Sequence, residues 1–341
     1  MGKCKNCGKE SPEISDVIGF CADCIRKGEA DLSLLHKKSR EIFGLPPFPP
    51  KSENGIKCGM CVNECILNEG ETGYCGIRKN INGKIVTIAN GHLDYYFDPL
   101  PTNCVAEWVC PGRFAYGYKN LAVFYRACTF NCLFCQNWHF KQGSIREVPP
   151  DVLAEEVDDR TFCICYFGGD PTPQLPHAIK TSRLALQKRK IRICFETNGT
   201  MNRNLLEEAA EIVFESGGCI KFDLKAYTKN LNVALCGITN ERTFENFEYL
   251  VKYFKKRKEP PFLVASTLLV PGYIDLYEVE QIAKFLYKLD PDIPYSLLAF
   301  YPSFILNDLP TTSREHAFAA RDIALKIGLK RVNIGNIHLL R

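Results

Sequence analysis

From about residue 119 onward, apolar runs alternate with amphipathic stretches, and this alternation constrains the fold more than any other feature of the sequence. Strands that alternate with helices over roughly 200 residues form parallel β/α units. A β/α barrel and a doubly wound open sheet both carry their reactive groups at the carboxyl ends of the strands, so the pattern leaves these two folds open. The predicted strands are 121–126, 162–167, 191–195, 220–224, 263–270, 295–300 and 332–337. The predicted helices are 152–159, 175–188, 202–215, 243–258, 276–289 and 313–327.

Two helix starts and one helix end carry capping signals. Asp275 with Glu278, and Thr312 with Glu315, fit the capping box, in which a side-chain oxygen and a carboxylate satisfy free amides of the first turn. Gly328 follows the last predicted helix, where glycine commonly ends a helix in the left-handed conformation.

The first 118 residues have a different texture and divide at a proline-rich run. Residues 45–50 read Leu-Pro-Pro-Phe-Pro-Pro, which can continue neither a helix nor a central strand. We therefore predict a four-cysteine module at 1–45, a second cysteine-rich segment at 46–118 and a β/α domain at 119–341. Asn-Gly turn signals in the second segment predict a small hairpin across 84–97.

Composition and charge exclude several classes of protein. The chain is 46% apolar and 24% charged, which is ordinary for a soluble globular protein. The net charge of +4 is too small to indicate a nucleic-acid partner. No apolar run is long enough for a membrane span, and the N-terminus lacks the apolar region of a signal peptide, so we expect a cytoplasmic protein.

The 18 cysteines are the most informative residues for chemistry, because clustered thiols in a reducing compartment bind metals. A paired C-x2-C spacing, which suits one zinc or a single iron, occurs at Cys4, Cys7, Cys21 and Cys24. A less regular, glycine-rich set is also predicted to bind zinc or a mononuclear iron, at Cys58, Cys61, Cys65 and Cys75. The pair Cys104 and Cys110 is open to either ligation or packing. The remaining cysteines near predicted strands are expected to be small buried side chains: Cys163, Cys165, Cys194, Cys219 and Cys236.

A third spacing, C-x3-C-x2-C, lies just after the first predicted strand and comprises Cys128, Cys132 and Cys135. Three thiolates this close can hold three irons of a 4Fe–4S cubane. The usual complement is four thiolates, so the fourth iron would stay open to an outside molecule.

Polar motifs follow the ends of the next predicted strands. Residues 168–171 read Gly-Gly-Asp-Pro, residues 196–199 read Glu-Thr-Asn-Gly, and residues 223–225 read Asp-Leu-Lys. Each motif alone could be an ordinary turn. Together, in order along one face of a β/α array, they predict a ligand site next to the cysteine triad.

With these motifs the sequence resembles the radical S-adenosylmethionine (SAM) superfamily, and most closely its glycyl-radical activating-enzyme branch, across roughly 120–341. The resemblance implies a partial (β/α)6 barrel with a cysteine-rich N-terminal extension, and a 4Fe–4S cluster whose open iron binds SAM. By position it implies that Gly168, Gly169 and Asp170 hold the methionine amino end and that Phe134 contacts adenine. Around the ribose, the carboxylate or a bound cation it places Glu196, Asn198, Asp223, Lys225 and Ser266. The activating enzymes carry a basic residue at the position of Ser266. They also carry a histidine-containing run where residues 298–301 of this chain read Leu-Ala-Phe-Tyr, so the glycyl-radical substrate is left open.

Residues 58–78, 266–272 and 293–300 resemble a narrower activating-enzyme-like group of archaea and bacteria. This resemblance implies cobalamin-dependent C-methylation of a glutamine in the methyl-coenzyme M reductase alpha subunit, with ferredoxin or flavodoxin as electron donor. A glycyl-radical activating enzyme and a non-catalytic metal scaffold are the alternatives. The resemblance identifies no catalytic residue beyond those that bind the cofactors.

Overall fold

The computed structural model describes residues 1–87, 90–102, 104–142 and 147–341. Its central element is an eight-stranded sheet with the order β14-β13-β12-β11-β10-β9-β8-β7. Strands β8 to β14 run parallel, and β7 pairs with β8 in the antiparallel direction. The strands are β7 (Leu93–Pro99), β8 (Lys119–Tyr125), β9 (Thr161–Gly168), β10 (Arg192–Thr197), β11 (Ile220–Asp223), β12 (Leu263–Leu269), β13 (Tyr295–Ala299) and β14 (Val332–Gly335).

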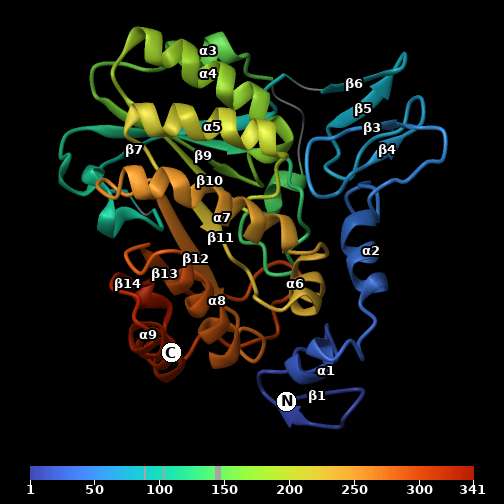
Figure 1. Ribbon diagram of the computed structural model, residues 1–341. Helices are drawn as coiled ribbons and strands as arrows, with labels where there is room; N and C mark the ends of the chain where they lie inside the picture. The colour runs from blue at the N-terminus through green and yellow to red at the C-terminus, as the bar shows by residue number, and fades with distance from the viewer. Residues whose placement is uncertain (88–89, 103, 143–146) are drawn as a thin grey trace.

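The parallel strands follow one another in sequence order, whereas a doubly wound sheet reverses its order at a switch point. Strands β7 and β14 are the two edges, so the curved sheet is a partial barrel and the predicted fold class is confirmed. Helices cover its outer face (Figure 1). They are α3 (Pro150–Glu155), α4 (Leu175–Lys188), α5 (Arg203–Ser216), α6 (Lys229–Cys236), α7 (Glu241–Lys256), α8 (Leu276–Leu289) and α9 (Arg314–Ile327).

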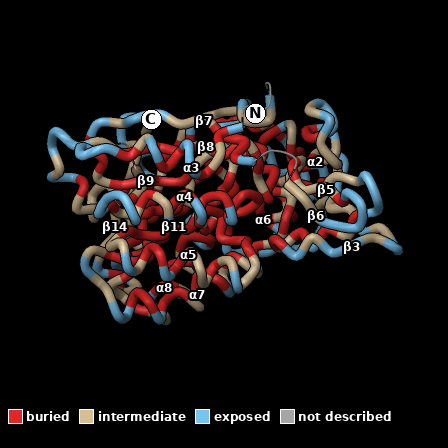
Figure 2. The backbone as a smooth tube through the Cα atoms, turned by 90° about the horizontal axis from the view of Figure 1, so that it is seen from above, coloured by how far each residue is buried: buried red, intermediate tan, exposed pale blue. Residues whose placement is uncertain are grey.

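Side chains alternate between the helix layer and the barrel interior along each strand. On β11, Phe222 packs edge-on against Phe247 of α7, so its neighbours Lys221 and Asp223 face inward. The main apolar core lies between sheet and helices, and buried backbone fills the centre of the molecule (Figure 2). A separate small core inside the barrel contains Ala106, Val264 and four cysteines.

The N-terminal segments lie beside the barrel, as the blue part of Figure 1 shows. Their elements are β1 (Gly2–Lys3), β2 (Glu10–Ser11), α1 (Ala22–Arg26), α2 (Ser33–Glu41), β3 (Ile56–Lys57), β4 (Ile66–Leu67), β5 (Arg78–Ile81) and β6 (Lys84–Thr87). The hydroxyl of Tyr273 links the first module to the barrel, because it accepts a hydrogen bond from the Ser15 amide and donates one to the Phe20 carbonyl. Arg26 also pairs with Asp275 at 2.5 Å, at the start of α8.

The predicted hairpin across 84–97 is wrong. Strand β6 pairs instead with β5 through the turn at Asn82 and Gly83, while β7 joins the main sheet along its whole length, from Leu93 opposite Tyr125 to Pro99 opposite Lys119. The sequence could not show this, because the free edge of β8 satisfies the backbone of β7 from a distant part of the chain. Residues 88 and 89, which precede the second turn signal at 90–91, lie outside the described part of the chain.

The glycine cap is confirmed, and one of the two predicted capping boxes is confirmed in part, because the Glu278 carboxylate bonds to the Tyr227 and Thr228 amides instead of the start of α8. The Asp275 side chain accepts a hydrogen bond from the Glu278 amide, and Gly328 ends α9 with φ of 115°. Thr312 does not cap α9, because Ser313 does so through the His316 amide. The Thr312 hydroxyl is instead committed to the Leu269 carbonyl and the Phe300 amide. No helix in the described part of the chain is long and apolar enough to cross a membrane.

Candidate functional site

A cavity of about 850 Å³ lies at the carboxyl ends of the parallel strands. Because these ends meet at one edge of a parallel sheet, residues far apart in sequence share its wall. The cavity is lined by all but one of the residues predicted for the cluster and for SAM, namely Cys128, Cys132, Cys135, Phe134, Gly168, Gly169, Asp170, Glu196, Asn198, Asp223 and Lys225. Ser266 is buried behind this wall and does not line the cavity.

The cysteine triad lies on the loop that follows β8, and backbone hydrogen bonds fix that loop. The amides of Asn131 and Leu133 donate to carbonyls at the end of α6, and the Asn63 side chain donates to the Thr129 carbonyl. The Phe130 amide donates to the Cys128 sulfur at 3.3 Å. The three thiols are half-buried, and a common cavity adjoins them.

A fourth thiol, which the sequence analysis assigned to packing, lies against this loop. Cys236 ends α6, and its thiol is the neighbouring group that does most to lower the pKa of the Cys132 thiol. The nearby ammonium groups of Lys225 and Lys141 act in the same direction. Lys141 is a second missed residue, and it donates to Asn131 at 2.7 Å while lining the cavity. Neither residue belongs to a spacing pattern, so no sequence signal pointed to them.

Asp170 organises the turns at the ends of β9 and β10. It is 3% exposed, and its carboxylate accepts hydrogen bonds from the Thr172 amide, the Asn198 amide and the Thr197 hydroxyl. A carboxylate has about four acceptor positions, so these three hydrogen bonds leave one position for a cationic group. Burial raises the pKa of Asp170, although these hydrogen bonds oppose the rise.

The opposite wall carries the charged ends of β10 and β11. The Lys225 ammonium lies 2.7 Å from Asp223, and Ser266 donates to the other oxygen of that carboxylate at 2.8 Å. Ser266 therefore orients Asp223 from behind. Burial raises the pKa of Glu196, and within the described residues its Oε1 atom is buried without a hydrogen-bond partner. An orphaned buried oxygen of this kind fits a ligand hydroxyl group that donates a hydrogen bond.

These features fit a 4Fe–4S cluster and SAM. Three thiols on one loop face a cavity that also offers an open acceptor position at Asp170, an orphaned acceptor at Glu196 and a cation at Lys225. The Phe134 ring lies beside them, with the Lys225 ammonium 5.9 Å from its centre.

Gly199 holds the Glu-Thr-Asn-Gly turn against β11, and we expect its replacement by alanine to be costly. Its φ is +73°, and an added Cβ atom would lie 2.1 Å from the Phe222 ring. Steric conflict and backbone strain together predict that Gly199→Ala lowers the free energy of unfolding by roughly 3 kcal/mol. Gly117→Ala is the matched control, because Gly117 also has positive φ (+83°) but nothing lies within 4 Å of the added atom. We expect it to cost roughly 1 kcal/mol. Equal denaturation midpoints for the two variants would contradict this prediction, because they would show that the Phe222 ring moves aside at little cost in stability.

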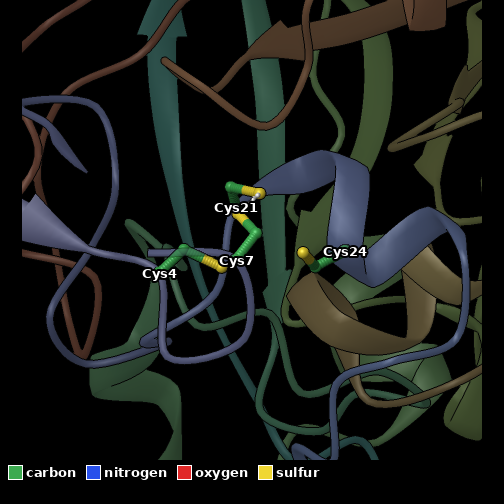
Figure 3. A group of neighbouring side chains, drawn as sticks. All are labelled: Cys4, Cys7, Cys21 and Cys24. Atoms are coloured by element: carbon green, nitrogen blue, oxygen red, sulfur yellow. Dashed lines mark hydrogen bonds between the residues drawn. The ribbon is translucent and has the colours of Figure 1, made fainter. Parts of the chain in front are cut away.

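The first N-terminal cysteine set forms a compact group. The ligand atoms of Cys4, Cys7, Cys21 and Cys24 all lie within 4.8 Å of one another, and Figure 3 shows their sulfurs directed toward a shared space. Burial acts to raise the pKa of Cys4, but hydrogen bonds from the backbone of Cys7, Cys21 and Asn6 outweigh it and lower that pKa to about 6. Cys4 is thus the thiol of this set that most readily forms the thiolate that binds a metal, whereas burial and the neighbouring thiols raise the pKa of Cys24 to about 12.

The second set also converges. Cys58, Cys61, Cys65 and Cys75 line a small cavity of about 10 Å³, together with Thr129 of the cysteine-triad loop. Burial raises the pKa of Cys65 to about 11, and the neighbouring Cys75 and Cys58 add to the rise. A cation bound among these thiols would instead lower their pKa values. The structure thus gathers the ligand atoms of the first set and arranges the second set around one cavity next to the triad loop.

Comparisons with known proteins agree with this architecture. The sequence profile of the radical SAM superfamily matches residues 122–286. The chain is 28% identical to the uncharacterized protein MJ0808 of Methanocaldococcus jannaschii, over 84% of this chain and 82% of that protein. It is 29% identical to the putative glycyl-radical enzyme activating enzyme MJ1632 of the same organism, over 58% of this chain and 74% of the relative. It is 28% identical to the pyruvate formate-lyase 1-activating enzyme of Escherichia coli strain K12, over 45% of this chain and 62% of that enzyme. The profile match, these relatives and the cavity at the strand ends lead to one assignment: residues 122–286 carry a radical SAM domain, and the chain is similar to proteins of the activating-enzyme-like branch.

Proposed function

We propose that this protein abstracts a hydrogen atom from a C–H bond of a protein substrate. The observation that carries this proposal is the convergence of the cysteine triad and the polar ends of β9, β10 and β11 on one cavity of about 850 Å³. When bound, the reduced 4Fe–4S cluster and SAM supply a 5′-deoxyadenosyl radical, and methylcobalamin would supply a methyl group.

The chain's own residues would bind and orient these groups. Cys128, Cys132 and Cys135 would ligate three irons, and the open acceptor position of Asp170 would receive the methionine ammonium, with Gly168 and Gly169 allowing close approach. The orphaned oxygen of Glu196 would accept from a ribose hydroxyl. The remaining predicted contacts are Phe134 to adenine, Asn198 beside the cluster loop, and Lys225 with Asp223 near the carboxylate, oriented by Ser266.

We propose C-methylation as the fate of the substrate radical, specifically of a glutamine in the methyl-coenzyme M reductase alpha subunit. Two features support it. Ser266 replaces the basic residue of the activating enzymes, and the sequence resembles the methylase group at 266–272 and 293–300. The cavity wall formed by β7, β8 and β9 also carries a stacked aromatic row, Tyr96, Phe124 and Phe167, against which a large flat cofactor can lie.

A second candidate is an enzyme that installs a glycyl radical on its partner and adds no methyl group. The relatives with activating-enzyme names favour this candidate. In both cases an electron donor such as ferredoxin or flavodoxin would serve the cluster. Zinc or a mononuclear iron would occupy each N-terminal cysteine set and would keep the segments that carry the two sets folded.

The deciding experiment uses the full chain, reconstituted under nitrogen and incubated with SAM, dithionite and the candidate partner protein. Formation of 5′-deoxyadenosine and methionine tests the radical chemistry. A substrate peptide heavier by one methyl group, together with cobalamin absorption, supports methylation. An electron paramagnetic resonance (EPR) doublet of a glycyl radical on the partner, without cobalamin, supports activation. The absence of SAM cleavage in the loaded protein would overturn both candidates.

We expect the Lys225→Met variant to bind SAM about tenfold more weakly, because methionine keeps the length of the side chain but loses a charge-assisted hydrogen bond worth roughly 1.5–3 kcal/mol. Anaerobic calorimetry of SAM binding measures the change. Lys229→Met is the matched control, since Lys229 is exposed and pairs with Glu241 on the surface. Equal affinities in the two variants would remove Lys225 from the ligand site.

A further inference from the structure

Six of the cysteines that the proposed function does not use gather inside the closed end of the barrel. Four of them come from three neighbouring strands, and two from the segment that crosses beneath them. All six line one small cavity of about 30 Å³. They are Cys104, Cys110, Cys163, Cys165, Cys194 and Cys219.

The sheet register produces the strand part of this cluster. Cys165 of β9 is the direct partner of Cys194 of β10, and Cys219, just before β11, accepts a backbone hydrogen bond from the residue after Cys194. Parallel neighbours in register lie about 4.8 Å apart on the same face, so their thiols form a row. Cys194 therefore lies between Cys165 and Cys219 in this row, and the sulfurs of Cys163 and Cys165 are 4.0 Å apart.

The crossing segment, residues 104–110, places two more sulfurs on the same small cavity and is anchored to the barrel. Trp108 donates to the Ser296 hydroxyl at 2.9 Å, and that hydroxyl donates to the Val105 carbonyl at 2.7 Å. Cys104 and Cys110 flank these anchors. Each of their sulfurs accepts a hydrogen bond from the amide two residues later, at 3.5 and 3.4 Å respectively. The amide of Phe130 makes the same contact with Cys128 of the triad.

Positively charged side chains face this cluster of thiols. Lys221 is 1% exposed, and its ammonium donates to the Cys104 sulfur at 3.1 Å. Arg192 and Arg113 also line the small cavity, where Glu107 is the acidic residue and pairs with Arg113. A buried ammonium is costly unless an anion faces it, and a thiolate beside Lys221 meets that need together with Glu196.

We propose that four of these six thiols, one from the crossing segment and one each from β9, β10 and the residue before β11, bind one soft divalent ion, Zn²⁺ or Fe²⁺. Thiolate ligands select such ions. One pair of sulfurs, those of Cys163 and Cys165, lies 4.0 Å apart, near the spacing of about 3.8 Å that tetrahedral coordination gives. The space of about 30 Å³ suits a single ion and not a cubane. Each thiol that becomes a ligand releases its proton to solvent, and no electron is transferred.

A bound ion would hold in place the part of the large cavity's wall that the crossing segment forms. Cys104, Val105 and Trp108 line the large cavity as well, so an ion that holds the crossing segment to β9, β10 and β11 also fixes that part of the wall. This inference does not rest on the proposed chemistry, because the triad and its loop lie at the other end of the strands.

The test is the metal content of the full chain, purified under nitrogen after growth with added Zn²⁺ or Fe²⁺. We expect Cys194→Ser and Cys219→Ser each to lose one equivalent of metal per chain relative to the unmodified protein. The 4Fe–4S absorption should stay unchanged. Ala122→Ser is the matched control, since it places the same hydroxymethyl group on the inner face of β8 and should lose no metal. Zinc or iron in the lost equivalent tells which ion the site takes.

A second measurement needs no variant and therefore does not depend on whether a variant folds. We expect Cys110, which is half-buried, to be alkylated by iodoacetamide at least tenfold faster after the metal chelator 1,10-phenanthroline is added. Unchanged metal content in both serine variants would overturn the proposal. So would equal alkylation with and without chelator, or a disulfide between Cys165 and Cys194 in the native protein.

Discussion

Replacing Cys132 with alanine is expected to abolish SAM cleavage, with 5′-deoxyadenosine formation falling by at least about three orders of magnitude, to the background rate. The physical reason is that a C-x3-C-x2-C loop offers three thiolates and no spare one, so the loss of one ligand releases the cluster. The measurements are iron and sulfide content, the visible absorption of the cluster and product chromatography, all under nitrogen.

Cys236→Ser is the informative companion of this variant, because Cys236 contacts Cys132 but lies outside the spaced triad. We expect the serine variant to keep its cluster, with a shifted reduction potential, since hydrogen bonds to the ligating sulfurs tune that potential. The reverse pattern, in which Cys236→Ser loses the cluster and Cys132→Ala keeps it, would show that Cys236 of α6 is the ligand and Cys132 is not.

The second large effect concerns the metal of the first N-terminal set. We expect Cys24→Ser, or a strong chelator, to unfold residues 1–31, because structural zinc contributes about 10–16 kcal/mol to small cysteine modules and this one has little apolar core of its own. Its buried apolar side chains outside the cysteines are few and include Ile14, Ile18 and Ile25.

Limited proteolysis with metal analysis measures this effect: the variant should lose one metal per chain and be cut within residues 1–31, while the barrel stays intact. Lys9→Ala is the control, because Lys9 lies in the same loop and makes only an exposed ion pair with Asp23. If Cys24→Ser keeps both its metal and its protease resistance, the four thiols of this set are not its ligands.

The secondary structure of the β/α region could be predicted closely because each element buries one face, which imposes a period on the sequence. The helices at 175–188 and 276–289 have the predicted limits, and the strands differ by one or two residues at their ends. The prediction was wrong where a distant partner decided the pairing. Strand β7 pairs with the edge of β8, and the Thr312 hydroxyl bonds to the Leu269 carbonyl and the Phe300 amide instead of capping α9.

The candidate site could be predicted in part for a similar reason. Motifs that end successive parallel strands must meet at one edge, so the approach of the cysteine triad to Asp170, Glu196 and Lys225 followed from their order alone. The position of Ser266 behind Asp223 did not follow from it, and neither did the contact of Cys236 with Cys132. Both depend on how a helix or a neighbouring strand packs.

The sequence by itself determined the parallel β/α architecture, the spaced cysteine sets and the chemistry of the strand ends, because these properties are local or follow from strand order. Only the tertiary structure decided which unspaced residues meet. Cysteines on three strands become one row because the register aligns them, and the crossing segment adds two more sulfurs because Trp108 is anchored on β13. Register and packing are set by the whole chain at once, so no single stretch of sequence contains them.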